Sequence, residues 1–295
     1  MEKEKGQAFA LLFVAFFMWG SVYVGAKLIS GMVPPPLLAC LRTCVGAACV
    51  SLMARKHWRV RIEKKDLRIL LLIGFLGYYA TVNLVQLGIA LTGASVAALI
   101  NALTPVSVTV FAAIVLREKI TRIKLACLAL ALAGTVVITG GTQSGGELLG
   151  SLCVMISVVT WGFASVYVRK LTAKYPPVLV TAYGLCISLL FHIPTGIVTY
   201  ASKGASLDLT AVLVIFYLGL AGTGVSQYTW SKCLSILPAS TCSLFYPLQA
   251  MFSALLGACI LGERFRPSFF LGLALICADV ALNTWESRRE GAAQK

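Results

Sequence analysis

Charged residues are scarce in this sequence. Asp, Glu, Lys and Arg make up 12% of its 295 residues, and 59% of the residues are hydrophobic, whereas a soluble domain is about 25% charged and about 45–50% apolar. No soluble fold of this length can bury so much apolar surface. Several apolar runs reach about 20 residues, the length at which a helix crosses roughly 30 Å of hydrocarbon. The composition therefore predicts an all-α polytopic membrane protein.

Motifs of enzymes and of metal sites are also missing. The chain has only two His and contains no HExxH helix, no Gly-x-Ser-x-Gly turn and no GxxxxGK[ST] phosphate loop. Its ten Cys fall almost entirely within apolar runs and never in Cys-x-x-Cys spacing, which is typical of small packing residues rather than of disulfides or metal ligands. We predict no catalytic residue, no metal, no cofactor and no hydrolysis of ATP by this chain.

Ten apolar runs are separated by charged or Gly/Pro-rich breaks. They cover about residues 8–28, 36–54, 69–90, 94–116, 122–140, 149–169, 178–200, 210–231, 239–261 and 267–285. With the N-terminus in the cytoplasm, most of the 25 Lys and Arg fall on the cytoplasmic side. The positive-inside rule therefore places both termini in the cytoplasm, with the protein in the plasma (inner) membrane. The net charge of +14 then indicates topology and contact with anionic lipid, and no nucleic-acid partner is expected.

An internal repeat runs through the chain. MWGSVYVGAKL at residues 18–28 is echoed by TWGFASVYVRKL at 160–171, and Pro34–Pro35 recur at the same spacing as Pro176–Pro177. Each copy holds five runs, an odd number, so the second copy enters the membrane with opposite polarity. We predict ten transmembrane helices as two inverted five-helix repeats, residues 8–140 and 149–285, with a linker at 141–148 and a cytoplasmic tail at 286–295. Inverted repeats are typical of secondary transporters, whose substrate site lies where the halves meet.

Polar side chains within the runs are candidates for that site, because polar groups are costly in hydrocarbon. Tyr79 and Asn83 lie on one helical face of the third run, and Asn101 lies near a proline of the fourth. A proline inside a membrane helix frees a carbonyl that neighbours or a watery cavity must satisfy. The predicted substrate-binding residues are Trp19, Tyr79, Asn83, Asn101, Trp161, Gln227, Tyr228, Tyr246 and Gln249. The alternative is that the polar groups only join helices by hydrogen bonds and that the aromatic rings only pack the core.

Five ionisable residues need separate interpretation. Glu118 and Glu263 end helices, where the macrodipole disfavours an anion, so we expect each to have a cationic neighbour. Arg42 lies within a run and would extend to the outer face, pair across helices or contact substrate. His192 is interpreted as a packing residue, with a role in proton coupling as the alternative. Asp279 is expected to be satisfied locally, and a role in proton coupling is the alternative.

Several features together resemble the drug/metabolite transporter superfamily, in its ten-helix branch with two EamA-type domains. They are the five-plus-five runs, the Trp-Gly pair in the first and sixth runs, the Pro-Pro pair followed by Arg42 in LACLRT, and Leu-x-Glu-Lys/Arg at residues 116–119 and 261–264. The second copy departs from the pattern, because Gly184 stands where the first has Arg42. The two halves are therefore expected to contribute unequally to the substrate path.

The resemblance implies a single-chain exporter or exchanger of small metabolites, amino acids or drugs that works by alternating access. Its expected partners are a small-molecule substrate and the lipid bilayer, with no ATPase subunit, and the protein is expected as a monomer or homodimer. A membrane channel or lipid scramblase is the alternative. Saturable counter-transport would identify a carrier, and substrate-independent lipid flipping would identify a scramblase.

Overall fold

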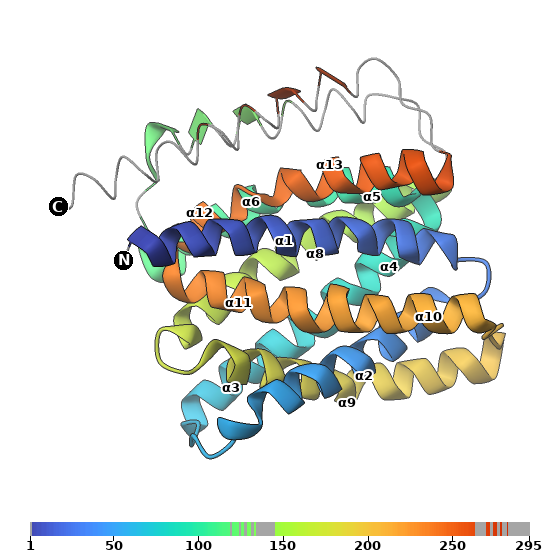
Figure 1. The fold of residues 1–295 in the computed structure, drawn as a ribbon, viewed down its shortest axis with the longest axis horizontal. Coiled ribbons are helices and arrows are strands. Elements are labelled where there is room, and N and C mark those ends of the chain that lie inside the picture. Colours follow the sequence, from blue (N-terminus) through green and yellow to red (C-terminus); the bar gives the residue numbers. More distant parts are fainter. Residues whose placement is uncertain are drawn as a thin grey trace.

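The chain folds as a bundle of long helices in a computed structural model (Figure 1). The structure describes residues 2–118 and 145–262 continuously, together with residues 120–123, 125–126, 129–130, 133, 270–271, 274–275, 278 and 282. No β-strand occurs in these residues. Seven of their helices are long and apolar enough to cross a membrane, which confirms a helical polytopic membrane protein. The predicted fifth and tenth spans fall largely outside the described residues, so the count of ten stays a prediction.

The first half contains three long spans and one broken span. Its elements are α1 (Glu2–Leu28), α2 (Pro35–Met53), α3 (Lys64–Leu72), a π-helical stretch (Ile73–Ala80), α4 (Thr81–Thr92), α5 (Ala94–Asn101), α6 (Thr104–Phe111) and a second π-helical stretch (Ala112–Leu116). The third span runs without a break from α3 through the π-helical stretch to α4. The fourth span is interrupted after Asn101, and Pro105 then lies in the first turn of α6, where a proline is tolerated.

The second half repeats this series. Its elements are α8 (Gly145–Thr172), α9 (Pro177–Lys203), α10 (Leu209–Tyr217), a π-helical stretch (Leu218–Val225), α11 (Ser226–Ile236), α12 (Ala239–Ser243), α13 (Tyr246–Leu256) and a π-helical stretch (Gly257–Leu261). The repeated proline pairs now have a structural role, because Pro35 begins α2 and Pro177 begins α9. One difference separates the halves: α13 has 11 residues where α6 has 8, about one additional turn. Tyr246 therefore matches Thr104 at the helix starts.

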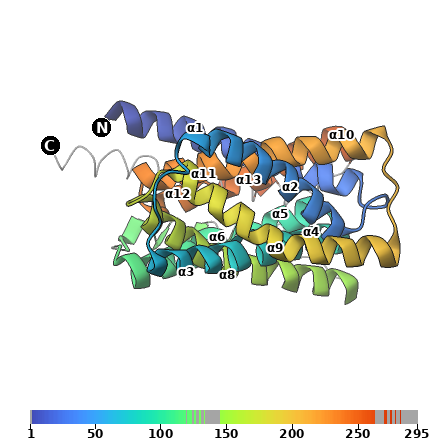
Figure 2. The same cartoon turned by 90° about the horizontal axis from the view of Figure 1, so that it is seen from below.

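The two halves pack on each other through exchanged contacts. α1 packs against α11 and α13, and α8 packs against α4 and α6 (Figures 1 and 2). Glycines permit the close approach: a Cβ at Gly77 would meet Ala164 of α8, and a Cβ at the equivalent Gly222 would meet Val22 of α1. The same contact is thus made twice with the halves exchanged, which places the middle of the bundle between equivalent surfaces of the two halves.

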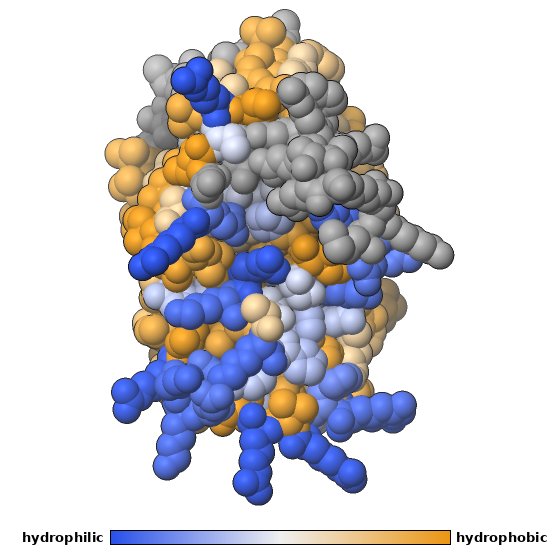
Figure 3. All heavy atoms as spheres, turned by 90° about the vertical axis from the view of Figure 1, so that its left-hand side faces the viewer, coloured by the Kyte–Doolittle hydropathy of each residue, from blue (hydrophilic) through white to orange (hydrophobic). Residues whose placement is uncertain are grey.

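Hydrophilic side chains gather over one end of the molecule, the end at which α1 and α3 begin (Figure 3). A network of charged groups lies there. Lys174, in the loop between α8 and α9, forms an ion pair with Glu63 and another with Asp66 at 2.8 Å. The Tyr175 hydroxyl also donates to Asp66 at 2.8 Å. The ammonium of Lys174, with that of Lys65, holds the pKa of Glu63 below its usual range, and the carboxylates of Asp66 and Glu63 raise the pKa of Lys174. The network joins the start of α3 to the α8–α9 loop.

Candidate functional site

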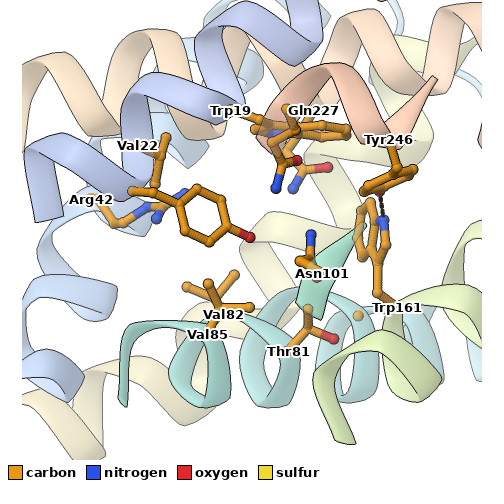
Figure 4. A pocket seen from close by; sticks show the side chains of 13 residues that line it. Trp19, Val22, Arg42, Thr81, Val82, Val85, Asn101, Trp161, Gln227 and Tyr246 are labelled. Atoms are coloured by element: carbon orange, nitrogen blue, oxygen red, sulfur yellow. Dashed lines mark hydrogen bonds between the residues drawn. The ribbon is translucent and has the colours of Figure 1, made fainter. Parts of the chain in front are cut away.

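A cavity lies in the middle of the bundle and is walled by both halves (Figure 4). About 500 Å³ of the space inside its lining is free of protein atoms, and this volume includes space open to solvent. The lining residues come from α1, α2, the third span, α5, α8, α11 and α13. They are Trp19, Val22, Tyr23, Arg42, Gly77, Thr81, Val82, Val85, Asn101, Trp161, Gln227, Tyr246 and Gln249.

The two tryptophans of the sequence repeat meet at this cavity. The rings of Trp19 and Trp161 pack edge to face with centroids 6.1 Å apart, and Trp19 stacks on Tyr246 at 5.9 Å. The indole Nε1 of Trp161 donates a hydrogen bond to the hydroxyl oxygen of Tyr246. These contacts tie α1 to α8 and α13, so the repeated tryptophans form a shared aromatic wall between the halves.

The glycine that follows each tryptophan has a separate role. A Cβ at Gly20 would lie 2.7 Å from Cβ of Phe252 and 2.9 Å from the carbonyl oxygen of Gln249, both on α13. A Cβ at Gly162 would collide with Ser107 of α6. Each Trp-Gly pair thus combines a ring at the cavity with a residue small enough for two helices to touch.

Six of the nine predicted site residues line the cavity. They are Trp19, Asn101, Trp161, Gln227, Tyr246 and Gln249. Whether they bind substrate stays a prediction, because their position alone does not test it. Asn101 is the last residue of α5 and Tyr246 the first of α13, so the interruptions in the fourth and ninth spans bring polar groups to the cavity wall. The positions beside the prolines were therefore an informative signal.

Tyr79, Asn83 and Tyr228 are not among the lining residues. The hydroxyl of Tyr79 hydrogen-bonds that of Thr195 on α9 at 2.9 Å, and Asn83 Nδ2 donates to the Tyr79 carbonyl and lies 3.3 Å from Nδ1 of His192. Tyr228 packs against the hydrophobic core. The polar groups of Tyr79 and Asn83 thus form hydrogen bonds to α9, and whether these residues contact substrate stays a prediction.

Tyr79 and Asn83 share one face of the third span, as predicted, but this face meets α9. The face that meets the cavity instead carries Gly77, Thr81, Val82 and Val85. These small and apolar residues have no distinctive sequence signal, and Tyr23 was missed although it belongs to the repeated motif.

Arg42 is the cation of the cavity wall. Its side chain is only 5% exposed, and Nε donates to Oγ1 of Thr223 at 2.9 Å. Among the described residues no carboxylate lies within ion-pair distance of it. At the matching place in the other half, the ring of Tyr78 packs where a Cβ on Gly184 would stand. Arg42 of the first half faces Thr223 of the second, and Gly184 of the second half faces Tyr78 of the first, so the two contacts between the halves exchange large and small side chains.

Glu118 lies against the start of α12, and its expected cationic neighbour stays a prediction. Its carboxylate accepts hydrogen bonds from the backbone N–H groups of Ala239 at 3.0 Å and Ser240 at 3.2 Å, and from the Ser240 hydroxyl at 2.6 Å. These N–H groups begin α12, where free donors and the positive end of the helix favour an anion. Glu118 thus joins the first half to a helix N-terminus of the second. Glu263 and Asp279 lie outside the described residues.

His192 is fully buried, in agreement with its interpretation as a packing residue. Nε2 lies 3.1 Å from the carbonyl oxygen of Tyr78, and Nδ1 faces Asn83. Because Nδ1 accepts from the amide of Asn83, Nε2 carries the proton and donates to the carbonyl. Both ring nitrogens are used within the bundle. The described Cys residues are all free thiols, and no cluster of metal-ligating side chains occurs among the described residues.

Known proteins resemble this chain over most of its length. Residues 7–140 and 148–285 each match the EamA-like transporter family. The chain is 27% identical over 282 residues to an uncharacterized transporter, YoaV, of Bacillus subtilis, with 92% of this chain and 95% of that protein covered. It is 27% identical to a probable terminal-alkyne amino-acid exporter of Streptantibioticus cattleyicolor, with 86% of each chain covered.

Two further comparisons agree. A probable amino-acid metabolite efflux pump of Salmonella typhimurium is 24% identical, with 95% of this chain and 94% of that protein covered. A crystal structure of another chain superposes with a TM-score of 0.74 at 22% identity, over 96% of this chain and 98% of that chain, which shows a shared fold. Because both EamA-like regions match and together cover most of the chain, the chain belongs to the EamA-like transporter family, within the drug/metabolite transporter superfamily.

Proposed function

We propose that the protein is a secondary transporter that exports or exchanges a small amphipathic metabolite through the central cavity. The observation that carries this proposal is that both halves wall the cavity, with the two repeated tryptophans in contact across it. A site between two mobile halves opens to one side of the membrane and then to the other when the halves rock about it. One relative named as a probable exporter and another named as a probable efflux pump support net outward transport.

The proposed architecture completes the described bundle as two inverted five-helix repeats, residues 8–140 and 149–285, in the plasma (inner) membrane with both termini in the cytoplasm. Support comes from the contacts that are made twice with the halves exchanged. The hydrophilic end in Figure 3 is then the cytoplasmic end. With this orientation, α1 enters from the cytoplasm, and Phe16 lies between Trp19 and the cytoplasmic face.

An aromatic layer closes the cytoplasmic side of the cavity in this arrangement. Phe16 packs edge to face on Tyr246 at 4.8 Å between ring centroids and on Trp230 at 6.0 Å. Both Phe16 and Trp230 are fully buried. Opening toward the cytoplasm requires these rings to separate, and the network around Lys174 must break or move with them. The state described here is therefore the one closed to the cytoplasm.

Counterflow in proteoliposomes tests the function. Vesicles loaded with an unlabelled candidate substrate should accumulate the labelled compound transiently, with saturable rates, because a carrier must reorient between turnovers. Vesicles without protein and vesicles with the Trp19→Ala, Trp161→Ala double variant serve as controls. Flux that does not saturate would identify a channel, and flipping of labelled lipid without substrate would identify a scramblase; either result would overturn the proposal.

A further inference from the structure

The charge of the cavity wall points to the charge of the substrate. The inference rests on the proposed function, because it treats the cavity as the transport site. Arg42 places a guanidinium, with five N–H donors, on the wall opposite Trp161 and Tyr246 (Figure 4). Only its Nε–H has a protein acceptor among the described contacts, the Thr223 hydroxyl. The terminal N–H groups, which suit a carboxylate bidentately, have no acceptor there.

We propose that the substrate is a small monocarboxylate of net charge −1 that carries an apolar body and an uncharged hydrogen-bond donor. A hydroxy acid or an N-acylated amino acid has this chemistry. A zwitterionic amino acid and a cationic amphiphile do not.

The net charge follows from electrostatics in a space of low dielectric constant. The described lining residues include one cation, Arg42, and no Asp or Glu. A monoanion therefore gives a neutral complex, and the attraction is not diluted by bulk water. A zwitterion would neutralise Arg42 with its carboxylate but would add an ammonium group that has no counter-ion among those residues. A simple cation would face Arg42 directly and be repelled.

The uncharged donor follows from Gln227. This residue lines the cavity and is 6% exposed, and its Oε1 has no hydrogen-bond partner among the described residues. Buried acceptors without a donor are rare in folded proteins. A hydroxyl or amide N–H on the substrate would supply the missing donor without bringing a second positive charge into the cavity.

The remaining wall suits an apolar body. Val82 and Val85 of the third span lie on one side of the cavity, Val22 and the ring of Trp19 come from α1 above them in the view, and the ring of Trp161 lies at the right (Figure 4). Aromatic rings contribute large contact areas and prefer offset or edge-to-face neighbours. An aryl or branched alkyl group fits between these surfaces while the carboxylate meets Arg42.

Four compounds that share one skeleton test the charge. Binding of 3-phenyllactate, 3-phenylpropanoate, phenylalanine and phenethylamine to the purified full-length protein is measured by thermal shift and by calorimetry. We expect 3-phenyllactate to bind about two-fold to ten-fold more tightly than 3-phenylpropanoate, since one neutral hydrogen bond is gained. Phenylalanine should bind at least about ten-fold more weakly than 3-phenyllactate, and phenethylamine should be weakest. Equal or tighter binding of phenylalanine would overturn the charge argument.

Variants then assign the effect to residues. Arg42→Gln should weaken binding of 3-phenyllactate roughly ten-fold to a hundred-fold and abolish the preference for anions, whereas Arg42→Lys should keep the preference. Lys203→Gln removes the same charge from the exposed end of α9 and should change nothing. Gln227→Met should remove the advantage of 3-phenyllactate over 3-phenylpropanoate. Asp279→Asn should leave the order of the four compounds unchanged, and a reversal would show that this carboxylate sets the charge of the cavity.

The outcomes separate this inference from the proposed function. If phenylalanine is the preferred compound and shows counterflow, the charge inference fails and the transporter remains. If none of the four compounds binds, the inference fails, whereas the proposed function fails only if the vesicles show unsaturable flux or lipid flipping. If Arg42→Gln does not fold, the order of the four compounds on the wild-type protein still decides.

Discussion

Replacement of Gly20 by Ala tests whether the Trp-Gly pair sets the spacing of helices at the cavity. The new Cβ would lie 2.7 Å from Cβ of Phe252 and 2.9 Å from the carbonyl oxygen of Gln249. Carbon atoms in contact prefer about 3.5–4.0 Å, so α1 and α13 must separate by roughly 1 Å. Overpacking of this kind costs about 1–3 kcal/mol. Because Gln249 lines the cavity, substrate affinity should fall together with stability.

Gly6→Ala is the matched control, because it makes the same substitution in the same helix. Gly6 is exposed, and no atom lies within 4 Å of the place of a new Cβ. Ala favours a helix over Gly by up to about 1 kcal/mol, so this variant should be as stable as wild type or slightly more so. The helix-propensity gain is common to both variants, so the free energy of unfolding, measured by denaturant titration in detergent, should differ between them by about 1–3 kcal/mol. Equal values, or unchanged substrate affinity in Gly20→Ala, would refute the reasoning.

Three further predictions use other parts of the molecule. Asn101→Ala and Gln249→Ala should each weaken substrate binding by about two-fold to a hundred-fold with little change in melting temperature; early melting with normal binding would make both residues structural. Glu63 has a lowered pKa in the folded protein, so its stabilisation is present above the unfolded pKa and is lost as pH falls through the folded pKa. Lys174→Met should therefore reduce the loss of thermal stability between about pH 5 and pH 3, and an unchanged pH profile would contradict the role of the network. Cysteine labelling should find residues 141–148 accessible from outside the cell, and labelling only from the cytoplasm would overturn the inverted topology.

The sequence was sufficient for the helical membrane class and for part of the cavity lining. Long apolar runs indicate helices buried in lipid, and a motif that occurs once in each half is expected at equivalent positions of the two halves. Trp19 and Trp161 could be found for that reason. Tyr246 and Gln249 could be found because a proline in an apolar run marks a break in the helix, where polar groups can reach the interior.

The rest of the site depended on geometry that composition does not encode. The sequence indicates which residues of the third span share a face but not which neighbour that face meets, and Tyr79 and Asn83 hydrogen-bond toward α9. Val82 and Val85 line the cavity but look like any lipid-facing apolar residue. The position of Arg42 could not be chosen among three options, because its partner Thr223 lies in the other half of the chain.

The exchange of large and small side chains between the halves limits how this protein can have arisen and how it can be rebuilt. A protein made of two copies of residues 8–140 would bring an Arg42 against a Tyr78 at both contacts, with too much volume at each. Two copies of residues 149–285 would set Gly184 against Thr223 twice and leave two voids. Only the mixed pairing fills both places. The packing of the fused chain therefore requires two different halves, and neither half would pack well against a second copy of itself in a symmetric dimer.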